Sequence, residues 1–203
     1  MGEAKQKQSK KSGLLGVADF LFDFVETFAI AVFAVLLIFT FFFRLCEVDG
    51  KSMENTLYDG QKLILSSFAY TPEQDDIVVF HLTKNGHEKN LVKRVIATSG
   101  QTVKIDFSAK EIYVDGVLYE DTHATLKEPY YNTITGTYTL FADHDYDGSN
   151  RIFSATVPEG FVFVLGDNRN NSNDSRFNSV GFVDERCILG KAILRLSPFT
   201  VYN

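Results

Sequence analysis

The sequence predicts a mainly β fold of antiparallel sheets with one N-terminal transmembrane helix, and three observations support this prediction. No charged residue interrupts the run from Thr27 to Phe43. After Gly60, short runs rich in β-branched and aromatic residues alternate with turn residues. No amphipathic helix of ordinary length follows Phe43, so we expect the helical part to be confined to the N-terminus.

The N-terminal part is expected to anchor the chain in the cell membrane. Extended back to Val25, the apolar run approaches the roughly 30 Å hydrocarbon thickness at about 1.5 Å per helical residue. We expect residues 1–15 to form a cytoplasmic tail and residues 16–44 to hold an interfacial segment and the spanning helix. Lysines in the tail favour a cytoplasmic N-terminus with the rest of the chain outside. The alternatives are a buried core helix and a cleaved signal peptide, although no small-x-small cleavage pattern follows the run.

Residues 45–203 are expected to form one extracytoplasmic β domain. Asp115-Gly116 lies between two apolar runs and favours a hairpin, because this pair readily adopts the two positive φ angles of a type I′ turn. The expected strands are Lys62–Ser66, Asp76–Leu82, Leu91–Ala97, Thr102–Asp106, Ile112–Val114, Val117–Tyr119, Thr137–Phe141, Ile152–Val157, Phe161–Leu165 and Ile188–Leu196.

Charge and cysteine content narrow the range of functions. The net charge of -6 gives no support for a nucleic-acid partner. The two cysteines, Cys46 and Cys187, fit neither a disulfide framework nor the spacing of metal ligands. Neither the charge nor the cysteines indicate a cofactor or a resident metal, and none is expected.

One acidic stretch is similar to the start of a calcium loop. Asp143, Asp145 and Asp147 stand at alternate positions before a glycine. The twelfth position of the loop, where a glutamate would close the site, is Ser154, and neither flank has a helical pattern. A bound cation and a solvated acidic turn are the two alternatives for this stretch.

Two further stretches contain residues that could act together in catalysis. Ser52 lies in a polar stretch two residues after Gly50, where it could be a turn residue or a nucleophile. Lys93 lies in a predicted strand, and alternation places it on the same face as Leu91 and Val95. It is either an exposed lysine or one whose pKa falls from about 10.4 toward neutrality because apolar neighbours desolvate it. A neutral amine can take the proton of a serine hydroxyl, which is the Ser-Lys form of nucleophile activation.

A third stretch, Gly166–Arg176, is a loop without aliphatic side chains that follows an apolar strand. It holds two arginines and two aspartates, which indicates a fixed polar network rather than a plain loop. Asp174 could pair with Arg94 or with Arg176. Ser172 could hold the amine of Lys93 in line with the serine.

Together the three stretches resemble the type I signal peptidases, the membrane-bound bacterial leader peptidases. The matching motifs are Ser52-Met53, Lys93-Arg94-Val95-Ile96 and Gly166–Arg176, in this order after an N-terminal anchor. The likeness runs from about residue 20 to the C-terminus, except for the more variable Ser108–Phe153, part of an expected β insertion at about residues 106–160. The resemblance implies the β fold of signal peptidases and SOS-repressor proteases. It also implies cleavage of signal peptides from exported preproteins after small residues.

The resemblance implies a role for each matching residue. Ser52 would be the nucleophile, Lys93 the general base and Ser172 the residue that orients the lysine. The residues expected to buttress the site are Arg94, Asp167, Asp174 and Arg176. Those expected on the substrate-binding strands are Asp49, Gly50, Met53, Leu91 and Val92. The implied partners are secretory preproteins and membrane lipid.

This sequence differs from the family pattern at two positions near the nucleophile, and two alternative functions are considered. Asn55 stands where the family commonly has proline, and Gly50 has no hydroxyl to serve as a second oxyanion donor. One alternative is a self-cleaving protease of the SOS-repressor type, although such a protein needs no anchor and this chain lacks a helix-turn-helix. The other is a catalytically inactive signal-peptidase-like scaffold acting in surface-protein or pilus assembly. Such a scaffold should have lost the serine or the lysine, whereas both are present here.

Overall fold

The chain divides into two units, Met1–Phe43 and Arg44–Asn203. The computed structural model describes residues 2–68, 70–84, 87–122, 124, 145–147 and 152–202. Within these ranges, only the backbone is described for residues 2–19, 84, 87 and 145–147.

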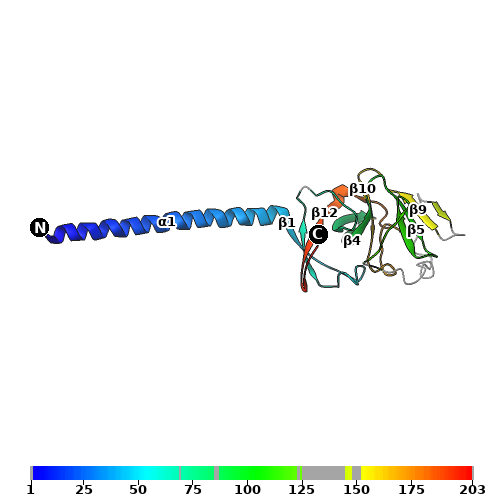
Figure 1. Ribbon diagram of the computed structural model, residues 1–203, viewed down its shortest axis with the longest axis horizontal. Coiled ribbons are helices and arrows are strands. Elements are labelled where there is room, and N and C mark those ends of the chain that lie inside the picture. Colours follow the sequence, from blue (N-terminus) through cyan, green and yellow to red (C-terminus); the bar gives the residue numbers. More distant parts are fainter. Residues whose placement is uncertain are drawn as a thin grey trace. The chain divides into compact units, whose positions relative to one another are not determined.

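The first unit contains the helix α1, which runs from Gly2 to Phe42 (Figure 1). Its segment Phe20–Phe42 is long and apolar enough to cross a membrane. At about 1.5 Å per residue, these 23 residues extend over about 35 Å, slightly more than the hydrocarbon core of a bilayer. The apolar segment begins earlier than Val25, because the preceding turn of the helix also exposes phenylalanine and leucine side chains.

The second unit contains two mostly antiparallel sheets in the described part of the chain. The larger sheet has the order β1-β2-β12-β3-β4-β10-β11, with β13 paired to β12. β12 pairs with β2 and with β3, and a 3-10 helix at Glu185–Cys187 leads into it. The strands are β1 (Phe43–Glu47), β2 (Lys62–Ser66), β3 (Ile77–Lys84), β4 (His87–Ala97), β10 (Phe161–Leu165), β11 (Val183–Asp184), β12 (Ile188–Leu196) and β13 (Phe199–Val201).

The smaller sheet has the order β7-β6-β5-β9-β8. The β6–β7 hairpin turns at Asp115 and Gly116, whose φ angles of 51° and 79° fit the type I′ turn expected from the sequence. Its strands are β5 (Thr102–Asp106), β6 (Glu111–Val114), β7 (Val117–Leu118), β8 (Asp145–Asp147) and β9 (Ile152–Thr156).

The predicted fold class, mainly antiparallel β with one N-terminal apolar helix, is confirmed. The strand expected at Thr137–Phe141 lies outside the described residues. The sequence patterns do not predict the short strands β1, β8, β11 and β13. Three of these strands have only two or three residues, which is too short for a recognisable pattern, and β1 directly continues the apolar run of the helix.

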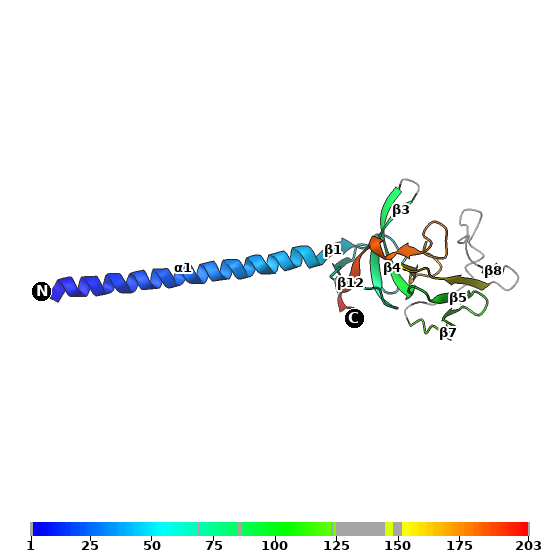
Figure 2. The ribbon, with the colours of Figure 1, turned by 90° about the horizontal axis from the view of Figure 1, so that it is seen from above.

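Two clusters of the hydrophobic core position the candidate site. In the first, Ile96 and Phe163 of the larger sheet pack with Ile105 and Phe153 of the smaller one. The chain passes directly from β4 into β5, so the two sheets lie side by side (Figure 2). The second cluster surrounds the loop between β1 and β2 and consists of Val48, Met53, Leu57, Leu63, Leu65, Ile77, Val79 and Ala192.

Candidate active site

The loop between β1 and β2 presents Ser52 on a tight turn. Gly50 has a φ angle of 91°, which favours glycine, and its N–H donates to Asp59 Oδ1 at 2.7 Å. The N–H of Leu57 donates to the carbonyl of Met53 at 2.8 Å. Met53 and Leu57 are 1% and 0% exposed, so the residues after the serine are anchored in the core. The backbone around Ser52 is therefore held from both sides.

The structure brings Lys93 of β4 into contact with this serine. The Lys93 Nζ and the Ser52 Oγ lie 2.6 Å apart, and the same nitrogen donates to the carbonyl of Val92 at 2.8 Å. The lysine is 1% exposed. Burial lowers the pKa of Lys93 from 10.5 to about 8, because the charged form loses its hydration. The amine can therefore be neutral near physiological pH, as a general base must be.

The third motif packs against the backbone of the nucleophile and forms hydrogen bonds with it. A Cβ built on Gly166 would lie 2.5 Å from the Ser52 carbonyl oxygen and 2.2 Å from the Ser172 Oγ, so only glycine fits without a shift of its neighbours. The backbone N–H of Asn168 donates to the Ser52 carbonyl at 3.0 Å, and its side-chain amide donates to the carbonyl of Lys51 at 3.0 Å. The two motifs thus fix each other's backbone.

Residues of the second and third motifs form two buried ion pairs. Arg94 donates to both carboxylate oxygens of Asp167, at 2.9 and 2.8 Å, and the two side chains are 4% and 0% exposed. Arg176 forms the same kind of pair with Asp174, with two bonds of 2.8 Å. Of the two partners considered for Asp174, the structure therefore provides Arg176. Burial raises the pKa of the Asp174 carboxyl, but the Arg176 guanidinium outweighs this effect and holds the pKa below its usual value.

Ser172 is buried beside these groups. Its hydroxyl is one of the groups that lower the pKa of Asp174, and its proximity to Gly166 places it next to the Ser52 backbone. Its role in orienting Lys93 stays a prediction. Among the residues expected to bind substrate, Met53 is buried, whereas the other four keep accessible surface: Asp49, Gly50, Leu91 and Val92.

The position where the family commonly has proline has a backbone that proline cannot adopt. Asn55 has a φ angle of 91°, whereas the proline ring restricts φ to about −65°. Asparagine is among the residues that tolerate positive φ. Asn55 therefore fits the positive φ of the turn after the nucleophile, and the hydrogen bond from the Leu57 N–H to the Met53 carbonyl stabilises this turn.

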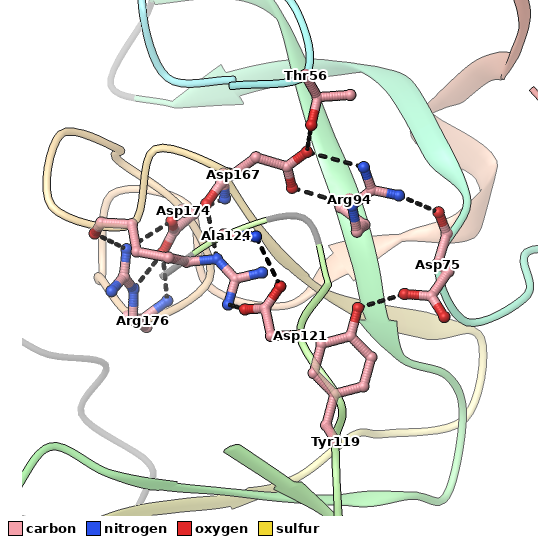
Figure 3. A network of polar contacts seen from close by, with 11 residues as sticks. Thr56, Asp75, Arg94, Tyr119, Asp121, Ala124, Asp167, Asp174 and Arg176 are labelled. Carbon is pink, nitrogen blue, oxygen red and sulfur yellow. Dashed lines mark hydrogen bonds and ion pairs between the residues drawn. The ribbon is translucent and has the colours of Figure 1, made fainter. Parts of the chain in front are cut away.

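Several polar residues of the site are not predicted from the sequence (Figure 3). Thr56 donates to Asp167 Oδ2 at 2.5 Å, and Arg169 forms an ion pair of 2.5 Å with Asp121. Tyr119 donates to the carboxylate of Asp75. Arg169 lies within the Gly166–Arg176 motif and Thr56 lies four residues after Ser52, so both could have been identified there, whereas Asp75, Tyr119 and Asp121 carry no local signal.

The acidic stretch similar to a calcium loop lies mostly outside the described residues. Asp143 and Gly148 are not described, and the backbone of Asp145–Asp147 forms β8, which pairs with β9. The alternatives of a bound cation and a solvated turn therefore stay open. Cys46 and Cys187 are free thiols.

A family model and two sequence relatives identify one family. The model of the family described as "Signal peptidase, peptidase S26" matches residues 21–197. A signal peptidase IB of Staphylococcus aureus is 32% identical over 188 residues, which cover 90% of this chain and 93% of the relative. A signal peptidase I of Bacillus amyloliquefaciens is 31% identical over 202 residues, 98% of this chain and 96% of the relative. A crystal structure of a signal peptidase I from Enterococcus faecalis V583 is 28% identical, covering 60% of this chain and 97% of that chain with a TM-score of 0.37.

Proposed function

The chain belongs to the signal peptidase family, peptidase S26, and from this premise we propose that it cleaves signal peptides with a Ser52–Lys93 dyad. As a member of that family it is a serine peptidase that removes signal peptides from secretory preproteins. The observation that carries the proposed mechanism is the 2.6 Å separation of the Lys93 nitrogen and the Ser52 hydroxyl in a buried setting.

In the proposed mechanism, neutral Lys93 removes the proton of Ser52 as its oxygen attacks the scissile carbonyl. The resulting ammonium then gives this proton to the leaving amine, so that the peptide bond breaks and an acyl-enzyme ester remains. A water molecule then attacks the ester while Lys93 accepts one of its protons. The ammonium returns this proton to the Ser52 oxygen as the ester bond breaks, so the second product is released and both residues regain their starting state. With a pKa of about 8, a useful fraction of the lysine is neutral at the start of the cycle.

The negative charge on the carbonyl oxygen requires hydrogen-bond donors. The backbone N–H of Ser52 would supply one of them, and Gly50 has no side chain to supply another. The Asn168 bond to the Ser52 carbonyl supports this role, because it fixes the orientation of the peptide groups around the nucleophile. We assign Arg94, Asp167 and the Asp174–Arg176 pair to holding these groups in place.

The substrate is proposed to bind as an added strand at the edge of β4. On the side away from β3, β10 pairs with β4 at Arg94, Val95 and Ala97. Leu91 and Val92 precede this pairing and keep accessible surface. An extended peptide could use their backbone groups, and its side chains would then alternate between pockets and solvent. Small side chains before the cut follow from the family resemblance.

The helix Phe20–Phe42 could cross a membrane, and we propose that it anchors the enzyme as a single span. The domain limits expected from the sequence are kept as part of this proposal: a cytoplasmic tail at 1–15, the anchor region at 16–44 and an outer catalytic domain at 45–203. Lysines in the tail support this orientation. Ser52 follows the end of the span by about ten residues, so a substrate would be cut close to the end of its own apolar segment.

The dyad is tested by purifying the full chain in detergent and measuring cleavage of a secretory precursor. We expect Ser52→Ala and Lys93→Ala each to lower the rate by at least about a thousandfold, because catalytic groups that act as a unit fail together. Lys104→Ala, which removes an exposed lysine on β5, is the control and should cleave normally. Near-full activity of Lys93→Ala would refute the dyad, and an inactive wild type would favour the scaffold alternative.

A further inference from the structure

A short segment that follows the smaller sheet contacts Asp75 and Arg169, two residues that are hydrogen-bonded to the arginines of the site's ion pairs. Tyr119 and Asp121 follow β7 directly, inside Ser108–Phe153, the stretch that the family motifs do not cover. Figure 3 shows both side chains pointing toward the polar groups around Arg94 and Asp174. We propose that Tyr119 and Asp121 are positioning residues. Through Arg94 and Arg169 they keep the Lys93 amine and the Ser52 hydroxyl at hydrogen-bond distance. This inference rests on the dyad proposed above.

The first branch runs from Tyr119 to the base. The Tyr119 hydroxyl donates to Asp75 Oδ1, and the Asp75 carbonyl accepts from Arg94 Nη1 at 2.7 Å. Asp75 has a φ angle of 75°, a conformation that a non-glycine residue keeps only when its surroundings hold it. Arg94 immediately follows Lys93, so the hydroxyl of Tyr119 stabilises the backbone on which the base is mounted.

The same branch continues to the nucleophile. Arg94 binds Asp167 through two hydrogen bonds, and Asp167 accepts a further bond from Thr56 Oγ1 at 2.5 Å. Thr56 lies in the turn that follows Ser52, and its N–H donates to the carbonyl of Met53 at 3.0 Å. One chain of contacts therefore joins the smaller sheet to the elements that carry both dyad residues.

The second branch runs from Asp121 to the third motif. Asp121 Oδ2 and Arg169 Nη1 lie 2.5 Å apart, with side chains that are 17% and 0% exposed. Arg169 Nε donates to the carbonyl of Gly166 at 2.9 Å, and the Arg169 carbonyl accepts from Arg176 Nη2 at 2.8 Å. Gly166 is the residue that contacts the Ser52 carbonyl so closely that a side chain would not fit. Asp121 thus acts on the nucleophile through Arg169 and Gly166.

Asp121 also balances the charge of a buried guanidinium. Burial lowers the pKa of Arg169, and the negative charge of Asp121 opposes this effect. Without Asp121, Arg169 would turn to the other carboxylates that act on it, Asp167 and Asp174. These two are already paired with Arg94 and Arg176, so their geometry around the dyad would change.

The loss of Asp121 should therefore be visible at Lys93. The charged groups that act on this lysine are Asp174 and Asp167, which raise its pKa, and Lys89 and Arg176, which lower it. Removing the charge of Asp121, or drawing the two aspartates toward Arg169, leaves more net positive charge near Lys93. The acidic limb of the pH–rate profile should then move to lower pH, an effect that general destabilisation of the fold does not produce.

The test uses the full chain in detergent and compares Tyr119→Phe and Asp121→Asn with the wild type. We expect kcat to fall about tenfold in each, because small displacements of reacting groups have effects of this size, while KM changes by less than about twofold. For Asp121→Asn the acidic limb should also shift down by a few tenths of a pH unit. Tyr119→Phe removes a single oxygen, so it decides the proposal if thermal unfolding shows that Asp121→Asn does not fold.

Two matched controls and one double variant complete the test. Tyr113→Phe removes a hydroxyl that donates to Glu111 at 2.6 Å on the same sheet, and Asp184→Asn breaks an exposed pair with Arg186. Both should cleave as the wild type does. In an Arg169→Gln background, adding Asp121→Asn should cause no further loss of kcat, because Asp121 acts through Arg169.

The opposite results would overturn the inference. Unchanged kcat and pH profile in Tyr119→Phe and Asp121→Asn would do so while leaving the dyad intact, as would additive losses in the double variant. If the wild type cleaved but Ser52→Ala and Lys93→Ala cleaved equally well, the proposed function would fail first and this inference with it. The two failures are therefore distinguishable.

Discussion

On one face of β4 the Lys93 nitrogen lies 2.6 Å from the neutral hydroxyl of Ser52, whereas on the other face Arg94 binds both oxygens of the Asp167 carboxylate. The two residues are neighbours and are almost equally buried, at 1% and 4% exposure. Burial disfavours both charges, yet the pKa of Lys93 falls to about 8 while that of Arg94 rises. The difference lies in the partner that each face provides.

This comparison shows that burial alone does not decide the state of a basic side chain. A carboxylate at hydrogen-bond distance compensates the lost hydration of Arg94, so this residue stays charged and stabilises the fold. A hydroxyl does not compensate a full charge, so Lys93 releases its proton more easily. One strand therefore carries a structural cation on one face and a proposed base on the other.

The largest effect on stability is expected from removing Arg94, whose charge is compensated by Asp167. Arg94→Met leaves the buried Asp167 carboxylate without its cation, which should lower the free energy of unfolding by about 3–5 kcal/mol. Denaturant unfolding of the full chain in detergent measures this loss. Arg186→Met is the matched control, because its pair with Asp184 is exposed, and we expect no measurable change there. Equal losses in the two variants would show that burial of the pair is irrelevant.

Removing the amine of Lys93, which has no carboxylate of the described residues at hydrogen-bond distance, should instead increase stability. The folded pKa of Lys93, about 8, lies below its ordinary value of 10.5, so protonation disfavours the folded state at every pH below about 8. Lys93→Met should therefore raise the free energy of unfolding by up to about 3 kcal/mol at pH 7. This gain should shrink as the pH rises from about 8 and vanish above about 10.5, where lysine is neutral in both states. Unfolding curves over this pH range would contradict the comparison if the two proteins differed by a constant amount.

The smallest expected effect comes from an exposed neighbour of the base. The charge of Lys89 lowers the pKa of Lys93, so Lys89→Ala should raise the acidic limb of kcat/KM, expected near pH 8, by a few tenths of a unit. High salt should abolish the difference, because exposed charges are screened. Lys104→Ala, on another strand, should leave the profile unchanged. An identical limb in Lys89→Ala at low salt would remove Lys89 from the electrostatics of the site.

Patterns that are local in the chain predicted much of this molecule. Runs of β-branched and aromatic residues between turn residues located β2, β5, β10 and β12 to the residue, and the Asp-Gly pair located the β6–β7 hairpin. The apolar run located the helix, although the structure extends its apolar segment to Phe20. In each case a few adjacent residues contain the whole signal, because a strand, a turn or a spanning helix depends on its own residues first.

The sequence by itself determined the β class, the apolar anchor and the three stretches that contain Ser52, Lys93 and the Gly166–Arg176 loop. Only the tertiary structure decided which charges pair. Asp174 binds Arg176 within its own loop, while Asp167 crosses to Arg94 and Asp121 reaches Arg169 from the smaller sheet. The Asp167–Arg94 and Asp121–Arg169 pairs join residues far apart in the chain, and local sequence does not show which aspartate meets which arginine. The choice depends on which side chains the packed sheets bury together, because a buried charge persists only where the fold supplies its partner.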